Sequence, residues 1–176
     1  SASGLIDRLD LPAAEWPRLS WRWKVEKAIV NGDVTRREGD DYPARVYVSF
    51  RYSPERVSPL VRLEYAAMRL LYGEYPPHAG LNYIWDAHAS VGTVAPNPYS
   101  DRVRMIVVES GTDRVGRWLA YERDVVADYR AAFGKDPPPI SGVGLMTDAD
   151  DTGESALAYY GDIALSRAPA TTAPAP

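Results

Sequence analysis

ISGVGLMTDADDTGESALAYYGDIALS, residues 140–166, predicts two β-strands joined by a polar turn. Residues 142–146 form a short apolar run, and residues 156–165 form a second run rich in Tyr, Ile and Leu. Between them, residues 147–154 hold three Asp and one Gly, a composition typical of turns. The sequence therefore predicts a hairpin here. The stretch also concentrates acidic side chains, so it is the first place to search for a site: Asp148, Asp150, Asp151, Glu154 and Asp162.

Three further stretches alternate apolar and polar residues with the period of two that indicates a strand with one buried face. Their expected inner residues are Leu19, Trp21, Trp23 and Val25 in the first, Val46, Val48, Phe50 and Tyr52 in the second, and Leu81, Tyr83 and Trp85 in the third. The outer face of the second stretch would carry Arg45, Tyr47, Ser49 and Arg51. Residues 3–11, 102–110 and 116–123 are also expected to be strands.

Two segments change to a helical period. A helix is expected to begin at Ser58-Pro59 and to end at Gly73, with Pro at its first position. Its apolar residues are Leu60, Leu63, Ala67, Leu70 and Leu71. A shorter helix over residues 124–133 would end at Gly134, which suits the position after a helix C-terminus. With about eight strands and Gly, Pro and Asp turns, the fold class expected is mainly β: an antiparallel, jelly-roll-like β-sandwich with one inserted helix and one short helix.

Composition limits the classes of protein that fit. The 176 residues suit one domain over residues 1–167, and residues 168–176 contain only Ala, Pro and Thr, as in a linker or a disordered tail. A net charge of −4 without a basic run argues against nucleic acid as a partner. No run approaches the roughly 18 apolar residues of a membrane span. There is no Cys, and the 5 Trp and 12 Tyr suit half-buried strands and binding surfaces.

Several short motifs stand in a specific order along residues 1–166. They are residues 3–5 (SGL), 17–23 (PRLSWRW), 39–48 (GDDYPARVYV), 83–85 (YIW), 97–99 (NPY), 123–130 (RDVVADYR), 133–134 (FG), 145–148 (LMTD) and 158–163 (AYYGDI). In this order they resemble the bacterial proteins of the domain of unknown function 3047 family. The resemblance implies a periplasmic or secreted bacterial protein and brings no activity. It also implies further strands before residue 3, so this chain is expected to lack N-terminal strands of the domain.

The end of the chain is more loosely similar to carbohydrate-binding jelly rolls of the galactose-binding and concanavalin-like kinds. Those domains often end in an aromatic strand that carries an Asp, as residues 159–163 do here. This is an analogy of fold alone.

A carbohydrate site is one interpretation of the residues around the second alternating stretch. Such sites place an aromatic face against the sugar ring and use carboxylates and Arg to bind hydroxyls. The candidate ligand-binding residues are Asp40, Arg45, Tyr47, Tyr83, Trp85 and Asp86. The alternatives are a solvated sheet face and a buried Asp–Arg pair that holds a loop. Trp21 and Trp23 are expected in the core.

The acidic turn has two interpretations, and the first is a metal site. Asp148, Asp150 and Asp151, followed by Gly153, resemble half of a calcium loop, which needs several oxygens and a sharp turn. An EF-hand would also need an acidic residue at its twelfth position, where Tyr159 stands. The alternative is a solvated turn without a cation. Asp162 would need Arg45 or Arg22 as a partner if it faced inward.

No catalytic motif is evident. His78 and His88 lack metal-ligand spacing, and there is no nucleophile elbow, dinucleotide fingerprint or P-loop. The first hypothesis is therefore a non-catalytic envelope module that binds carbohydrate or another polar ligand. The second is a polysaccharide lyase or hydrolase, which would need a groove holding Tyr, His and Arg or two facing carboxylates. The third is a structural or assembly protein that pairs through an open sheet edge.

Overall fold

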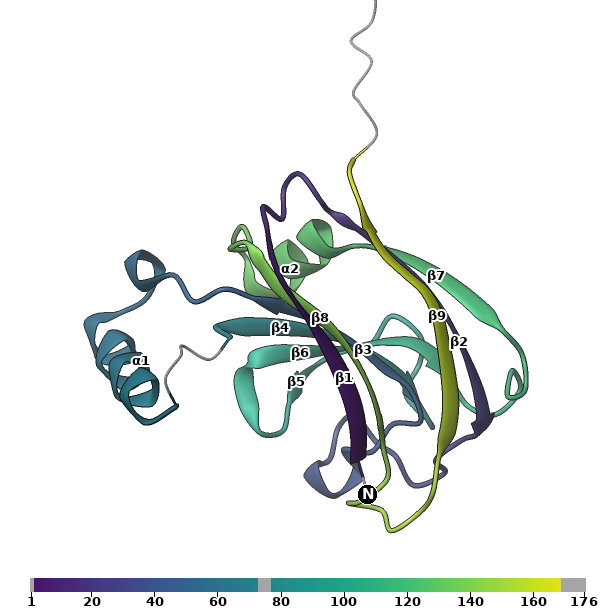
Figure 1. The fold of residues 1–176 in the computed structure, drawn as a ribbon. Coiled ribbons are helices and arrows are strands. Elements are labelled where there is room, and N and C mark those ends of the chain that lie inside the picture. Colours follow the sequence, from purple (N-terminus) through teal and green to yellow (C-terminus); the bar gives the residue numbers. More distant parts are fainter. Residues whose placement is uncertain (1, 73–76, 169–176) are drawn as a thin grey trace, which may run out of the picture.

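The chain folds mainly into β-strands that form two sheets, in a computed structural model that describes residues 2–72 and 77–168 (Figure 1). The predicted tail lies outside these residues, apart from Ala168. The larger sheet contains, in order, β1 (Ala2–Leu11), β8 (Ile140–Asp148), β3 (Arg45–Phe50), β4 (Ala79–Asp86), β6 (Ser100–Ser110) and β5 (Val94–Asn97). The smaller sheet contains β7 (Leu119–Asp124), β2 (Arg18–Lys27) and β9 (Leu157–Ser166). The helices are α1 (Pro59–Tyr72) and α2 (Val125–Phe133), with short 3₁₀ turns at Arg37–Gly39 and Pro54–Arg56.

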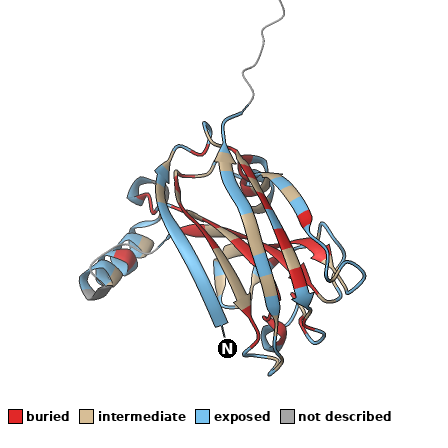
Figure 2. Cartoon of the chain, turned by 45° about the vertical axis from the view of Figure 1, so that its right-hand side comes forward, coloured by how far each residue is buried: buried red, intermediate tan, exposed pale blue. Residues whose placement is uncertain are grey.

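The inner faces of the two sheets meet in one hydrophobic core. Trp21 and Trp23 of β2 are fully buried, as the alternation predicted. The ring of Trp21 lies 5.3 Å from that of Tyr83, and the ring of Trp23 lies 6.3 Å from that of Trp85, both in β4. In Figure 2 the buried residues follow these inner strands, whereas β1 is exposed along most of its length. Aromatic contacts therefore join the sheets.

The two strands of residues 140–166 belong to different sheets, so the hairpin prediction was wrong. β8 pairs with β1 and β3, whereas β9 pairs with β2. The acidic turn is a link from one sheet to the other. Side chains connect the two strands where backbone pairing does not: the Tyr160 hydroxyl of β9 donates to the Met146 carbonyl of β8 at 2.6 Å.

Two further features of the larger sheet differ from the predicted pattern. β4 and β6 pair in parallel, so the sheet is not entirely antiparallel. β5 was not among the predicted strands, and it contains Pro96. It is an edge strand on β6, and Pro96 is tolerated because an edge strand can do without one backbone N–H donor. Jelly-roll connectivity stays a prediction.

The helices begin and end close to the predicted residues. Asp124 caps α2, its Oδ1 accepting from the N–H groups of Val126 and Ala127, and Gly134 follows with a φ of 68°. α1 extends from the body (Figure 1), and its expected apolar face is turned to solvent: Leu60, Leu63 and Leu70 are 77%, 69% and 88% exposed.

The contact between α1 and the body is aromatic. Tyr65 is buried, and its ring stacks on that of Tyr52 at 4.0 Å. Over the described part of the chain, neither helix has the length and apolar character needed to cross a lipid bilayer.

Candidate functional site

The outer face of the larger sheet, which points away from the smaller sheet, carries the polar residues of the second alternating stretch. In β3, Arg45, Tyr47 and Ser49 lie on this face because Val46, Val48 and Phe50 face the core. Strand register places Tyr47 between Gly144 of β8 and Asn82 of β4. It likewise places Ser49 between Gly142 and Gly80. Small residues thus lie side by side across three strands.

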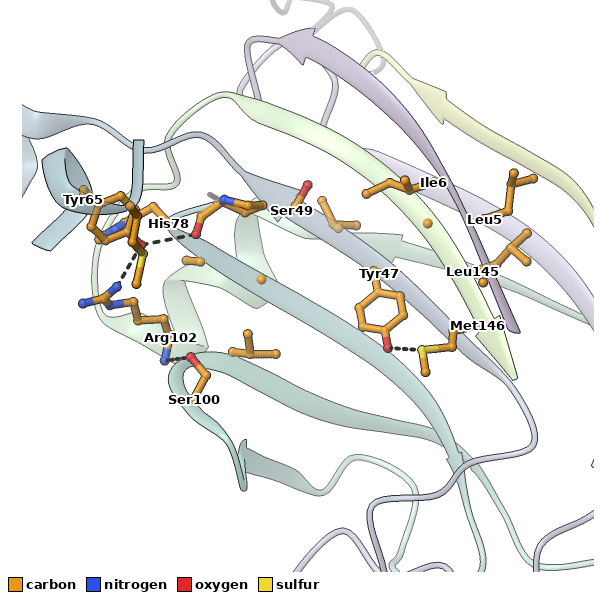
Figure 3. A pocket seen from close by; sticks show the side chains of 18 residues that line it. Leu5, Ile6, Tyr47, Ser49, Tyr65, His78, Ser100, Arg102, Leu145 and Met146 are labelled. Atoms are coloured by element: carbon orange, nitrogen blue, oxygen red, sulfur yellow. Dashed lines mark hydrogen bonds between the residues drawn. The ribbon is translucent and has the colours of Figure 1, made fainter. Parts of the chain in front are cut away.

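Ser49, Gly80 and Gly144 of this row form the floor of a hollow of about 570 Å³. Its size falls in the range of small-molecule pockets, roughly 300–1,000 Å³. Ile6 of β1, Tyr47 and Met146 lie toward one end, and Tyr65, His78 and Arg102 lie at the other (Figure 3). The Tyr47 hydroxyl is 3.0 Å from Met146 Sδ. Apolar side chains therefore dominate the walls, and polar groups concentrate at one end.

The polar end of the hollow is built from three elements. Arg102, at the start of β6, donates from Nη1 to the Tyr65 hydroxyl of α1 at 2.8 Å and pairs from Nη2 with Glu64 at 3.2 Å. His78, just before β4, is 8% exposed, and its Nδ1 has no hydrogen-bond partner among the described residues. Burial, helped by the charges of Lys135 and Arg102, lowers the pKa of His78. His78 therefore lines the hollow with a buried ring nitrogen whose hydrogen-bonding capacity the described residues do not use.

The opposite end of the same face holds a buried ionic cluster. Arg45 donates from Nη2 to Asp148 Oδ2 at 2.6 Å and to the Asp40 carbonyl at 2.5 Å, and its Nη1 lies 3.7 Å from Asp40 Oδ2. All three residues are buried. Burial raises the pKa of Asp40, with Arg45 opposing it. This is the Asp–Arg pair that the sequence offered as the alternative to a sugar site.

The acidic turn is held against this cluster from outside the turn. Asp41 Oδ1 accepts from the Asp150 N–H at 3.1 Å, and Asp41 Oδ2 accepts from the Thr152 N–H at 2.5 Å. Burial first, and then the adjacent Asp150 carboxyl, raise the pKa of Asp148 to about 7. Glu154 accepts from the N–H groups of Val30 and Asn31 at the other end of the turn. The turn is therefore anchored at two points.

The predicted ligand-binding residues separate into three places. Asp40, Arg45 and Tyr47 share the outer face. Tyr83 and Trp85 lie in the core between the sheets, where the Tyr83 hydroxyl donates to Asp128 at 2.8 Å and Trp85 Nε1 donates to the Gly111 carbonyl at 2.8 Å. They alternate with outer-face residues along β4, so they cannot reach the hollow.

Asp86, at the end of β4, organises loops. One of its oxygens accepts from the Val34 N–H at 2.9 Å, and the other accepts from the N–H groups of His88 at 2.7 Å and Ala89 at 2.6 Å. These three backbone donors engage its carboxylate at a buried position. Asp86 therefore holds two loop segments together.

Two of the three predicted metal ligands lie together. Asp148 and Asp150 form a group with Asp41, in which one carboxylate oxygen of each lies within 4.8 Å of the others. Asp151 faces elsewhere and accepts from the Tyr99 hydroxyl at 3.2 Å. Asp162 pairs with Arg22 at 2.8 Å on the exposed surface and adopts a positive φ of 52°.

Apart from Tyr47, sequence reasoning missed the residues that form the hollow. The signal available was Gly144, because a glycine inside a strand often marks a place where another group approaches the backbone closely. Gly80 and Ser49 become part of the same floor only through strand register. His78 and Arg102 are brought to its end by the start of β4 and of β6, positions that no local motif indicates.

Comparison with known proteins identifies one family. The model of the family described as protein of unknown function (DUF3047) matches residues 1–164. No curated protein matches this chain.

Proposed function

Because the chain belongs to the DUF3047 family of proteins of unknown function, which brings no activity with it, we propose a function from the geometry of the outer face. The protein is a non-catalytic module that binds a small ligand in the hollow on the larger sheet. The ligand combines an apolar body, which lies along the glycine floor, with a polar or anionic group at the end that holds His78 and Arg102. The observation that carries this proposal is the hollow itself, about 570 Å³ in volume.

The walls support the apolar part of the ligand. Ile6, Met68, Val103 and Met146 line the hollow together with the rings of Tyr47 and Tyr65. Among the described residues that line it, none is a carboxylate. Burying apolar ligand surface contributes roughly 25 cal/mol per Å² before the costs of association. A purely polar ligand would leave most of this surface unmatched.

The polar end of the hollow supports the polar or anionic group of the ligand. The Arg102 side chain is 29% exposed, and its guanidinium is oriented by the hydrogen bond to Tyr65. His78 Nδ1 is buried without a partner, which costs free energy that a ligand hydrogen bond would recover. Both residues line the same end of the hollow (Figure 3).

Filling the floor tests the proposal. A Cβ on Gly80 would have Val48 O at 3.5 Å and a Val103 methyl at 3.6 Å as its nearest neighbours, so the backbone there accepts a side chain. Gly80→Leu would then occupy the hollow. We expect it to weaken binding of decanoate and of anilinonaphthalene sulfonate, measured by fluorescence titration and displacement, by about tenfold or more. Ala120→Leu adds a side chain to an exposed position on the smaller sheet and is the control.

Two results would overturn the proposal. One is a wild-type protein that binds neither probe. The other is Gly80→Leu protein that folds, by circular dichroism, and binds both probes as tightly as the Ala120→Leu control. The sequence instead led to the expectation of a carbohydrate ligand, and the Tyr47 ring on the outer face supports that alternative. A panel of neutral oligosaccharides in the same assay distinguishes a carbohydrate ligand from an amphipathic one.

A polysaccharide lyase is the second candidate, because Tyr65, His78 and Arg102 together line one end of the hollow. Tyr65 weighs against it. Burial raises the pKa of its hydroxyl, which is bonded to the Pro77 carbonyl and to Arg102, so it is poorly suited to accept a proton at neutral pH. Incubation with uronate polymers, read by the absorbance of unsaturated products, tests this candidate. Product formation that disappears in Tyr65→Phe would favour the enzyme.

The setting and finer fold of the module also belong to this proposal. A periplasmic or secreted location is supported by the Ala, Pro and Thr composition of residues 168–176. A jelly-roll-like sandwich is supported by the two facing sheets. Fractionation of cells that express the native gene tests the location.

A further inference from the structure

Three carboxylates from two distant parts of the chain meet beside the acidic turn. Asp148 ends β8, Asp150 follows in the turn, and Asp41 comes from the segment before β3. One oxygen of each lies within 4.8 Å of the other two. Asp41 is directed there because its own oxygens hold the N–H groups of Asp150 and Thr152. The arrangement is therefore set by the backbone of the turn and by a buried residue, Asp41, which is fully inaccessible to solvent.

Asp148 supplies the observation that points to a ligand. It is 7% exposed, and Arg45 occupies only its Oδ2. Its Oδ1 is buried and has no hydrogen-bond partner among the described residues. The Asp150 carboxyl lies beside Asp148 and, when ionised, can only accept hydrogen bonds, so it cannot donate one to Oδ1. A buried carboxylate oxygen that meets other carboxylates is costly unless a cation or a proton lies between them.

Charge near the group is unbalanced. Arg45 is the cation that contacts Asp148, and it is shared with Asp40. Asp41 and Asp150 add two more carboxylates, since one oxygen of each lies within 4.8 Å of one oxygen of Asp148. Carboxylates therefore outnumber the one guanidinium that contacts Asp148.

We propose that Asp41, Asp148 and Asp150 bind a divalent cation of the calcium type, through one carboxylate oxygen each. Hard divalent cations prefer carboxylate, carbonyl and water oxygens, and calcium accepts irregular sets of six to eight of them. Because Asp150 is exposed, water can complete the coordination sphere on its side. Arg45 holds Asp148 Oδ2 and so leaves Oδ1 as the ligand atom. The cation would connect the acidic turn, which links the two sheets, to the segment before β3. This would stabilise the Arg45 end of the outer face, and it does not depend on a ligand in the hollow.

Binding is tested on the whole chain after removal of metals by chelation. Isothermal titration with CaCl₂ is expected to show one saturable site. The midpoint temperature of thermal unfolding is expected to rise with CaCl₂ concentration, because a ligand that binds the folded state stabilises it. Terbium luminescence, sensitised by nearby Tyr42, reports the same site and is expected to be displaced by calcium. MgCl₂ at the same concentrations is expected to give a smaller effect, because magnesium demands a regular octahedron of ligands.

Two variants with equal charge change localise the site. Asp150→Asn replaces a charged ligand oxygen with a neutral one at an exposed position and is expected to weaken calcium binding by about tenfold or more. Asp151→Asn removes the neighbouring charge, which lies outside the group, and is expected to bind as the wild type does. The proposal is overturned if wild-type protein shows no saturable signal with calcium, if Asp150→Asn binds unchanged, or if Asp151→Asn weakens binding as much as Asp150→Asn.

Discussion

Arg45 Nη2 and Asp148 Oδ2 lie 2.6 Å apart where β3 and β8 meet, and both side chains are almost completely buried. Removing one partner of such a pair leaves a charge without compensation in a place that water does not reach. Arg45→Met should therefore lower the free energy of unfolding by about 3 kcal/mol in urea titrations. The loss is limited because Asp148, whose pKa is already raised, takes up a proton when the guanidinium is absent.

The control for this prediction is Arg18→Met. Arg18 pairs with Glu122 at 2.5 Å, with 40% and 57% of the two side chains exposed. Exposed pairs contribute about 0–1 kcal/mol. If Arg45→Met protein is as stable as Arg18→Met protein, the prediction that the buried Arg45–Asp148 pair stabilises the fold is wrong.

Trp23 joins the two sheets, because its ring contacts Trp85 across the core and Tyr121 within its own sheet. Truncating a fully buried aromatic side chain removes its contacts and leaves a cavity. Trp23→Ala should lower the free energy of unfolding by about 3–5 kcal/mol. Trp118, 46% exposed, is the matched tryptophan, and Trp118→Ala should cost less than about 1 kcal/mol. Guanidinium unfolding followed by far-ultraviolet circular dichroism measures both.

Asp124 starts α2 by accepting from two N–H groups that the helix itself cannot satisfy. Asp124→Ala should lower the free energy of unfolding by about 1 kcal/mol, whereas Asp124→Asn, which retains an acceptor oxygen, should lose much less. Chemical unfolding of both variants compares them directly. Equal losses would mean that the charge, and not the capping hydrogen bonds, is what α2 requires.

His78 makes stability depend on pH in a defined direction. Its folded-state pKa is lowered from the ordinary 6.5 by burial and by the charges of Lys135 and Arg102. Below pH 6.5 the unfolded chain therefore binds a proton that the folded chain binds less readily. The contribution of His78 to stability is complete above pH 6.5 and is lost as pH falls from 6.5 toward the lowered folded-state pKa.

Urea unfolding of wild type and His78→Gln at a series of pH values between 7.5 and 5 tests this (about half-unit steps suffice to resolve one titration). The free energy of unfolding should fall less steeply toward acid pH in His78→Gln than in wild type. Identical slopes in wild type and His78→Gln would be incompatible with a buried, neutral His78.

The alternation of β2, β3 and β4 could be read from the sequence because sidedness is a local property of an extended chain. It placed Trp21 and Trp23 in the core and Arg45 and Tyr47 on the opposite face, as the structure has them. The helix spans were predictable for the same reason, through Pro59, Asp124 and Gly134. The exposure of the leucines of α1 could not be predicted, because helical spacing does not show whether another surface of the protein covers the apolar face of a helix.

The sequence by itself determined a mainly β chain, the inner and outer residues of its central strands, and an acidic turn after residue 146. Tertiary structure alone decided that this turn links two sheets, that Asp41 and not Asp151 joins Asp148 and Asp150, and that Gly80, Gly142 and Ser49 adjoin. These relationships depend on which strands pair and in what register, and the same alternating pattern is compatible with many pairings. The long-range packing of side chains such as Trp23 and Trp85 selects one of them.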